Sequence, residues 1–283
     1  MEWSNVYGSE LLIGIIGSGL IAALALRKGA LSRSGAWSAV LMGTGYYVLG
    51  GPIWYGALLA FFISSTMWSR WKKHHRAKRT AEAHYEKTSR RDAGQVWANG
   101  GAGLALCAAH AVWPDSGWVY AFAGVMASVC ADTWATEIGA LSKSMPRSVL
   151  TAQRVAPGTS GGVTPLGTLA ALAGAAFIGT VCALLALLQP APAAAVAAAA
   201  PAALLLAASA AGLAGAFADS LLGASGQAMY RCRLCGSDTE RAVHCGAAAE
   251  RIRGFAWLNN DRVNLLSSLA AGLLGWAIGT LVA

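Results

Sequence analysis

The chain has 283 residues, of which 56% are hydrophobic and only 12% are charged, and its formal net charge is +8. So few charged residues cannot cover a soluble surface, and the composition predicts a single transmembrane domain over residues 1–283. In a membrane protein the positive-inside rule explains the excess of basic residues, so no nucleic-acid partner is expected.

Apolar stretches long enough to cross a bilayer recur along the chain, separated by short charged or Gly- and Pro-marked breaks. The first, Leu11 to Leu26, has acidic residues before it and basic residues after it, the reverse of a signal peptide, so we expect an uncleaved first helix. The predicted fold class is all-α, a polytopic transmembrane helical bundle of about eight helices, with seven as the alternative. The expected helices are 8–26, 35–50, 52–69, 95–113, 117–141, 164–189, 202–228 and 263–283.

All 21 lysines and arginines fall in alternate connections, which are residues 27–34, 70–94, 142–163 and 229–262. Because Lys and Arg concentrate in cytoplasmic connections, we expect these four inside a bacterial plasma membrane and both termini outside. The basic loop 70–94 contains the densest run, Arg70 to Arg79. That run is typical of a stop-transfer signal or a contact with anionic membrane lipids, and docking of a phosphorylated substrate is the alternative.

Polar side chains gather on one face of the expected helix 117–141. Asp132 and Thr136 are four residues apart, as are Thr133 and Glu137, so the four share a face near the inward end. Ionisable residues inside a membrane helix are costly and indicate function. The alternative is that such groups only hold helices together or conduct ions.

The expected helix 202–228 repeats this arrangement, because Asp219 and Ser220 also lie near its inward end. The repetition suggests a bundle built from repeated helical hairpins. Carboxylates and hydroxyls suit Mg²⁺, which proteins commonly hold through one or two carboxylates plus substrate phosphates. The expected catalytic carboxylates are Asp132, Glu137, Asp219 and Asp261, of which the first three are the expected Mg²⁺ ligands.

Polar connections follow both of these helices. One is rich in glycine over residues 157–162, and the other is rich in asparagine over residues 259–264. Glycine-loop N–H groups and helix N-termini bind anions, so phosphate is the expected guest, although the Lys-Ser/Thr pair of a P-loop is missing. The expected phosphate-binding residues are Asn99, Thr133, Thr136, Arg147, Gly158, Thr159, Gly161, Gly162, Ser220, Asn260, Arg262 and Asn264, with the two arginines as charge clamps.

The loop 229–262 contains a Cys/His cluster made of Cys232, Cys235, His244 and Cys245. A Cys-x2-Cys pair is a common half of a zinc site, and the His/Cys pair can complete a tetrahedral Cys3His set. Free reduced thiols are the alternative. A scaffold that binds a partner protein through this loop is a further hypothesis for the chain.

Five segments resemble the motifs of one integral membrane family, long listed as of unknown function, which includes the plant phytyl-phosphate kinases. The resemblance covers roughly residues 12–281. The segments are Gln95-Val96-Trp97-Ala98-Asn99-Gly100, Asp132-Thr133-Trp134-Ala135-Thr136-Glu137, Pro157-Gly158-Thr159-Ser160-Gly161-Gly162, Asp219-Ser220-Leu221-Leu222-Gly223 and Asn260-Asp261-Arg262-Val263-Asn264.

This resemblance implies phosphoryl transfer from a nucleoside triphosphate, with CTP as the expected donor, to a polyprenyl monophosphate such as phytyl or geranylgeranyl phosphate. The Cys/His cluster is outside the family pattern. A rival from another class is a transporter or flippase for a phosphorylated lipid or an ion, which would use the same carboxylates as a relay. The placement of those carboxylates toward the inward end favours the enzyme.

Overall fold

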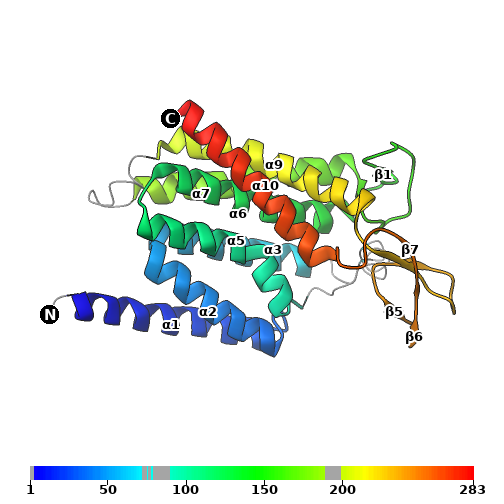
Figure 1. Ribbon diagram of the computed structural model, residues 1–283, viewed down its shortest axis with the longest axis horizontal. Coiled ribbons are helices and arrows are strands. Elements are labelled where there is room, and N and C mark those ends of the chain that lie inside the picture. The colour runs from blue at the N-terminus through cyan, green and yellow to red at the C-terminus, as the bar shows by residue number, and fades with distance from the viewer. Residues whose placement is uncertain (1–2, 72–74, 76–77, 79–89, 189–198) are drawn as a thin grey trace.

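The computed structural model describes residues 3–71, 75, 78, 90–188 and 199–283. These residues form eight helices, which confirms the expected count (Figure 1). The helices are α1 (Trp3–Arg27), α2 (Arg33–Gly50), α3 (Pro52–Arg70), α5 (Ala93–Val112), α6 (Ser116–Gly139), α7 (Pro165–Leu187), α9 (Pro201–Ser225) and α10 (Asn260–Val282).

Side-chain caps account for several helix starts. Asp92 and Gln95 form a reciprocal capping box at the start of α5, and the Thr164 hydroxyl accepts a hydrogen bond from the Gly167 N–H at the start of α7. At α10 the Asn259 side chain accepts from the Arg262 N–H, so the helix begins at Asn260. The expected start at residue 263 is therefore wrong. The Asn/Asp segment is the first turn of a helix and not part of a connection.

The helix α6 forms the centre of the bundle, and α7, α9 and α10 pack around it. Close packing depends on glycines, as a Cβ on Gly124 would lie 2.5 Å from the Ala271 carbonyl oxygen and one on Gly212 would lie 2.7 Å from the Ala127 Cβ. Small residues at helix contacts are typical of membrane bundles. Apart from Trp118, every residue of α6 from Gly117 to Ala131 is buried.

Four of these helices, α1, α7, α9 and α10, are long and apolar enough to cross a membrane on their own. The helix α6 is not among these four, and it packs against protein over most of its length. The fold is thus a polytopic helical membrane bundle, as expected.

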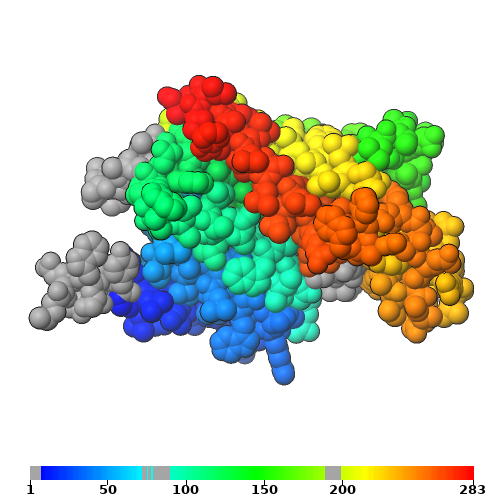
Figure 2. Space-filling model, in the orientation of Figure 1, coloured from blue at the N-terminus to red at the C-terminus, as the bar shows by residue number. Residues whose placement is uncertain are grey.

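The two ends of the bundle differ. Both termini lie at one end, and the short strands lie at the opposite end, with the connections that carry the basic residues (Figure 1). There the chain from β3 to β7 and the loop that carries β1 project beyond the helices (Figure 2). We call residues 226–259 the β-lobe.

Small antiparallel sheets at this end were not expected from the sequence. The strands β1 and β2 pair, β3 is flanked by β4 and β7, and β5 pairs with β6. None exceeds four residues, too short for a clear alternating pattern. The strands are β1 (Arg147–Ser148), β2 (Gly162–Val163), β3 (Met229–Arg231), β4 (Asp238–Thr239), β5 (Val243–His244), β6 (Ala247–Ala248) and β7 (Glu250–Arg253).

Candidate functional site

A cavity of about 640 Å³ opens at the end of the bundle that carries the strands. That volume is in the range of small-molecule sites, roughly 300–1,000 Å³. Its walls come from the last turns of α6 and α9, the first turns of α5, α7 and α10, and the connections between them. The cavity contains thirteen of the residues expected from the sequence, namely Asn99, Asp132, Thr133, Thr136, Glu137, Gly158, Thr159, Gly161, Gly162, Asp219, Ser220, Asn260 and Asn264.

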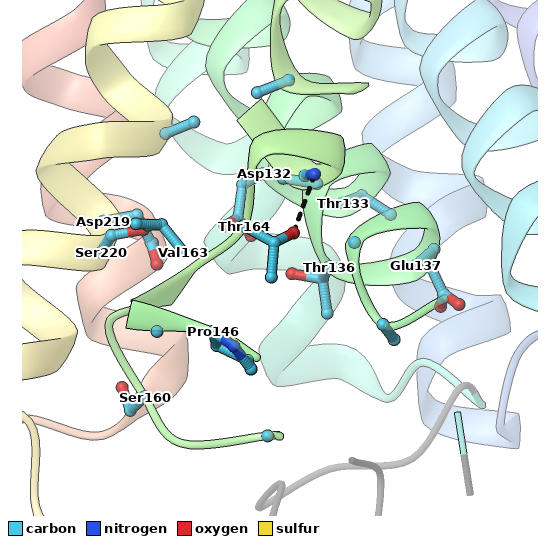
Figure 3. Close-up of a pocket in the computed structure, with 18 of the residues that line it drawn as sticks. Asp132, Thr133, Thr136, Glu137, Pro146, Ser160, Val163, Thr164, Asp219 and Ser220 are labelled. Atoms are coloured by element: carbon cyan, nitrogen blue, oxygen red, sulfur yellow. Dashed lines mark hydrogen bonds between the residues drawn. The ribbon is translucent and has the colours of Figure 1, made fainter. Parts of the chain in front are cut away.

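Two carboxylates from different helices face this cavity. Asp132 follows directly on the buried residue Ala131 of α6, and Asp219 comes from α9 (Figure 3). The two are close enough for their charges to interact. The Ser267 hydroxyl of α10 donates a 3.1 Å hydrogen bond to Asp219 Oδ2, so three helices meet at this carboxylate.

The glycine-rich loop lies against α9 and forms a second wall. Gly158 and Gly161 have φ of +84° and +78°, a region that favours glycine. A Cβ on Gly161 would lie 2.4 Å from the Ala224 Cβ, so the loop can approach the helix only without a side chain. The Ser160 hydroxyl donates to Gln227 Oε1 at 2.8 Å and ties the loop to the β-lobe.

Three helix N-termini converge on the same space. Gln95 lies in the first turn of α5 with Asn99 one turn further on, Gly167 lies in the first turn of α7, and Asn260 begins α10 with Asn264 one turn further on. Each N-terminus carries a partial positive charge, which favours bound anions. The cavity is therefore suited to phosphate at several points.

Glu137 faces a partner that the sequence did not indicate. Lys78 Nζ lies 2.7 Å from Glu137 Oε2 and also donates a 2.7 Å hydrogen bond to the Trp68 carbonyl. Lys78 is buried, with only 1% of its surface exposed. Part of the basic loop 70–94 thus lies inside the cavity, while residues 72–74, 76–77 and 79–89 of that loop lie outside the described part of the chain.

Arg91 lines the cavity from the residue before the α5 cap. Its guanidinium lies over the rings of Phe61 and Phe62 and donates to Thr66 Oγ1 at 3.3 Å. Burial lowers the pKa of Arg91 to about 10, and the nearby charge of Glu137 opposes that shift. Arg91 therefore stays positively charged at neutral pH.

The lining carries nearly balanced charge. Among the described residues, four carboxylates face three permanent cations around the cavity. Phosphates entering this space add negative charge that the cations alone do not neutralise, which favours a bound metal cation. The carboxylates are Asp132, Glu137, Asp219 and Glu240, and the cations are Lys78, Arg91 and Lys143.

Comparison with known proteins identifies the family. The model of the DUF92 integral membrane proteins matches residues 16–272. The chain belongs to the DUF92 family of integral membrane proteins. The family resemblance seen in the motifs is thereby confirmed.

Relatives of this DUF92 chain come from plants and archaea. Protein PGR of Arabidopsis thaliana is 30% identical over 280 residues, which cover 94% of each chain. An uncharacterized membrane protein of Methanocaldococcus jannaschii is 29% identical over 270 residues, 94% of this chain and 93% of that protein. The chloroplastic Protein VTE6 of Arabidopsis thaliana is 28% identical over 272 residues, 94% of this chain and 68% of that protein. No solved structure matches.

Three predicted site residues of this DUF92 protein do not line the cavity. The Arg147 guanidinium is exposed and donates to the Ala152 carbonyl at 2.8 Å. Arg262 is exposed and donates to the Trp257 carbonyl, and Asp261 lies beside it in the first turn of α10. The expected roles of Arg147 and Arg262 as charge clamps, and of Asp261 as a catalytic carboxylate, stay predictions.

The Cys/His cluster lies in the β-lobe, apart from the cavity lining. One ligand atom from each of its four residues lies within 4.8 Å of all the others. Among the described residues this is the one such group of three or more His, Cys, Asp or Glu side chains, and the three expected Mg²⁺ ligands do not form another. Hydrogen bonds from the Ser237 side chain and backbone lower the pKa of the Cys235 thiol to about 6.

Proposed function

We propose that this protein is a membrane-embedded kinase. It would transfer a phosphoryl group from a nucleoside triphosphate, with CTP as the expected donor, to a polyprenyl monophosphate such as phytyl or geranylgeranyl phosphate. The observation that carries the proposal is the convergence of two carboxylates, a glycine loop, three helix N-termini and buried cations in one cavity. The resemblance to the family of plant phytyl-phosphate kinases supports the same chemistry.

The donor set of the cavity fits Mg²⁺. Asp132 and Asp219 offer hard oxygen ligands from two helices, and Mg²⁺ typically takes one or two carboxylates together with substrate phosphates. Glu137, the third expected ligand, pairs with Lys78, so we assign it the role of holding that cation in the cavity. When bound, Mg²⁺ would neutralise charge on the transferring phosphoryl group.

The reaction needs positioning more than acid–base catalysis. An oxygen of the acceptor monophosphate would attack the γ-phosphorus of the donor, the bond to the β–γ bridging oxygen would break, and the nucleoside diphosphate would leave. The acceptor is already anionic, so no strong base is required. Lys78, Arg91 and the glycine loop would orient the two phosphates against each other.

A small apolar groove of about 60 Å³ adjoins the cavity and would receive the part of the prenyl tail next to the phosphate. It lies between α1, α2, α3 and α5, and its lining includes Ala39 and Phe62. The groove shares Arg91, Gln95 and Asn99 with the cavity, so the phosphate head of a lipid and the first part of its tail would occupy adjoining sites.

The test is a direct assay of the purified protein in lipid nanodiscs. Each nucleoside triphosphate, labelled at the γ-position, is combined with Mg²⁺ and with geranyl, farnesyl, geranylgeranyl or phytyl phosphate. The expected result is a labelled prenyl diphosphate with at least one pairing. If no pairing gives diphosphate while vesicles containing the protein move prenyl phosphate between leaflets, the protein is the transporter of the rival hypothesis.

A further inference from the structure

Besides the cavity, the described chain has a second cluster of chemically reactive side chains, which lies in the β-lobe. Two tight turns bring them together. Cys232 and Cys235 lie in the turn between β3 and β4, while His244 ends β5 and Cys245 follows it in the turn to β6. We propose that these four residues bind a structural zinc ion, which holds the β-lobe against the cavity. This proposal does not depend on the kinase activity.

The distances fit a tetrahedral site. With Zn–S of about 2.3 Å and Zn–N of about 2.0 Å, neighbouring ligand atoms stand roughly 3.5 to 3.8 Å apart. His244 Nδ1 lies 3.5 Å from Cys235 Sγ and 3.2 Å from Cys245 Sγ. All four ligand atoms lie within 4.8 Å of one another, so a zinc ion can bind with only small side-chain movements.

The backbone explains how two adjacent residues can both be ligands. In extended backbone His244 and Cys245 would point to opposite sides. Cys245 instead has φ of +53° and Gly246 has φ of +77°, so the chain turns back and both side chains reach one point. Positive φ at both central residues is what a two-residue hairpin turn requires, and this turn is what brings the Cys245 thiol next to the His244 ring.

The first turn has the form expected of a Cys-x2-Cys ligand pair. The Cys232 N–H donates to the Ser237 carbonyl, and the Gly236 N–H donates to the Cys232 carbonyl, both at 2.9 Å. Gly236 has φ of +72°, which closes the turn. Cys232 is buried, with 1% of its surface exposed, whereas Cys235 and Cys245 are exposed at the surface of the lobe. The lobe has few large buried side chains of its own, so a metal would supply much of its stability.

The zinc would affect the cavity by fixing a part of the cavity wall that the β-lobe supplies. Glu240 directly follows β4, is buried with 8% exposed, and lines the cavity together with Gln227 at the base of the lobe. At that base Arg253 donates to the Ala224 and Gly223 carbonyls of α9 at 2.5 and 2.9 Å. The base is therefore fixed by the bundle, and the zinc would fix the outer turns that position Glu240.

The experiment measures the metal itself. The full-length protein is purified under reducing conditions from zinc-supplemented cells, and zinc is counted by mass spectrometry of the metal. We expect about one zinc per chain, near zero in Cys232→Ser and His244→Ala, and about one in the control Cys182→Ala, whose cysteine lies buried in α7. Cobalt added to metal-free wild-type protein should give thiolate charge-transfer and tetrahedral absorption bands.

A second measurement reports on the lobe without any activity assay. Trypsin can cut at Arg231, Arg233 and Arg251, which are exposed on the lobe. We expect chelation to increase cleavage there at least several-fold while the helices stay intact, and zinc to reverse the effect. The proposal is overturned if reduced wild-type protein retains no zinc and gives no cobalt spectrum. It is also overturned if Cys232→Ser with Cys235→Ser retains zinc at the wild-type level.

Discussion

The two parts of α6 behave in opposite ways. From Gly117 to Ala131 the helix is almost wholly buried, and its neighbours approach through glycine and alanine. From Asp132 to Gly139 it carries hydroxyls and carboxylates that line the cavity. The first part packs against protein on all sides, whereas the residues of the second are mostly half-buried. The polar part is held in place because the apolar part is packed too closely to shift.

The boundary between the two parts is at Asp132, and the largest effect is expected there. Asp132→Asn keeps the shape of the side chain but removes its charge, so the Mg²⁺ and phosphate site proposed above loses a ligand. We expect turnover to fall by about 100- to 1,000-fold, the usual range for removing one group that stabilises transition-state charge. The measurement is diphosphate formation, with thermal melting as the control. A variant with normal turnover would contradict the assigned role.

A substitution in the apolar part of α6 should lower the stability of the protein rather than its turnover. In Gly124→Val the new side chain would meet the Ala271 carbonyl oxygen and the backbone of Gly275, neither of which can move without shifting α10. Overpacking of this kind costs about 1–3 kcal/mol. Thermal melting in detergent measures the loss. Gly19→Val on α1, where no atom lies within 4 Å of the added Cβ, is the matched control and should melt like the wild type.

The ion pair between Lys78 and Glu137, on the polar part of α6, gives a smaller expected effect but a more specific test. Lys78→Met leaves the Glu137 carboxylate without this partner and Glu137→Gln leaves the buried Lys78 ammonium without it, whereas the double variant removes both charges. We expect the stability losses to be non-additive by about 1 kcal/mol, since contacting residues couple by roughly 0.5–3 kcal/mol. The control is Lys143→Met with Glu137→Gln, because Lys143 is an exposed cavity residue. Additive losses in both pairs would mean that Lys78 and Glu137 do not interact.

The smallest effect is expected in the apolar groove beside the cavity. Ala39→Phe would fill part of the groove and is expected to raise KM for geranylgeranyl phosphate about 3-fold, roughly 0.6 kcal/mol, with little change in kcat. KM for the nucleotide should stay the same. Trp37→Phe on the same helix, 74% exposed, is the control. An equal rise in KM for both substrates would mean that the groove does not bind the tail.

Much of the fold could be predicted because its signals are local. The eight helices follow from apolar length and from the basic residues in alternate connections. The start of α10 was missed by three residues, although Asn259 is a favoured cap and offered a signal. The strands could not be predicted, since pairs such as β5 and β6 are two residues long and are held by turns.

The site was predicted where its residues form motifs and missed where contacts cross the chain. Asp132 and Asp219 could be predicted because polar residues stand out at membrane depth, and the glycine loop because of its composition. Lys78 was not, because its partner is 59 positions away and a lysine in a basic run has no distinguishing pattern. Glu240 was missed for the same reason. Only the folded β-lobe places it in the cavity wall.

The described lining residues place the cavity at the end of the bundle opposite the termini, and this has a consequence for the supply of substrate. A lipid whose phosphate must enter there has to present its head in the leaflet on that side. Molecules of the same lipid in the other leaflet cannot be used until they cross. Under the proposed function, product would also accumulate in one leaflet. The rate in a cell would then depend on lipid translocation as well as on the protein itself.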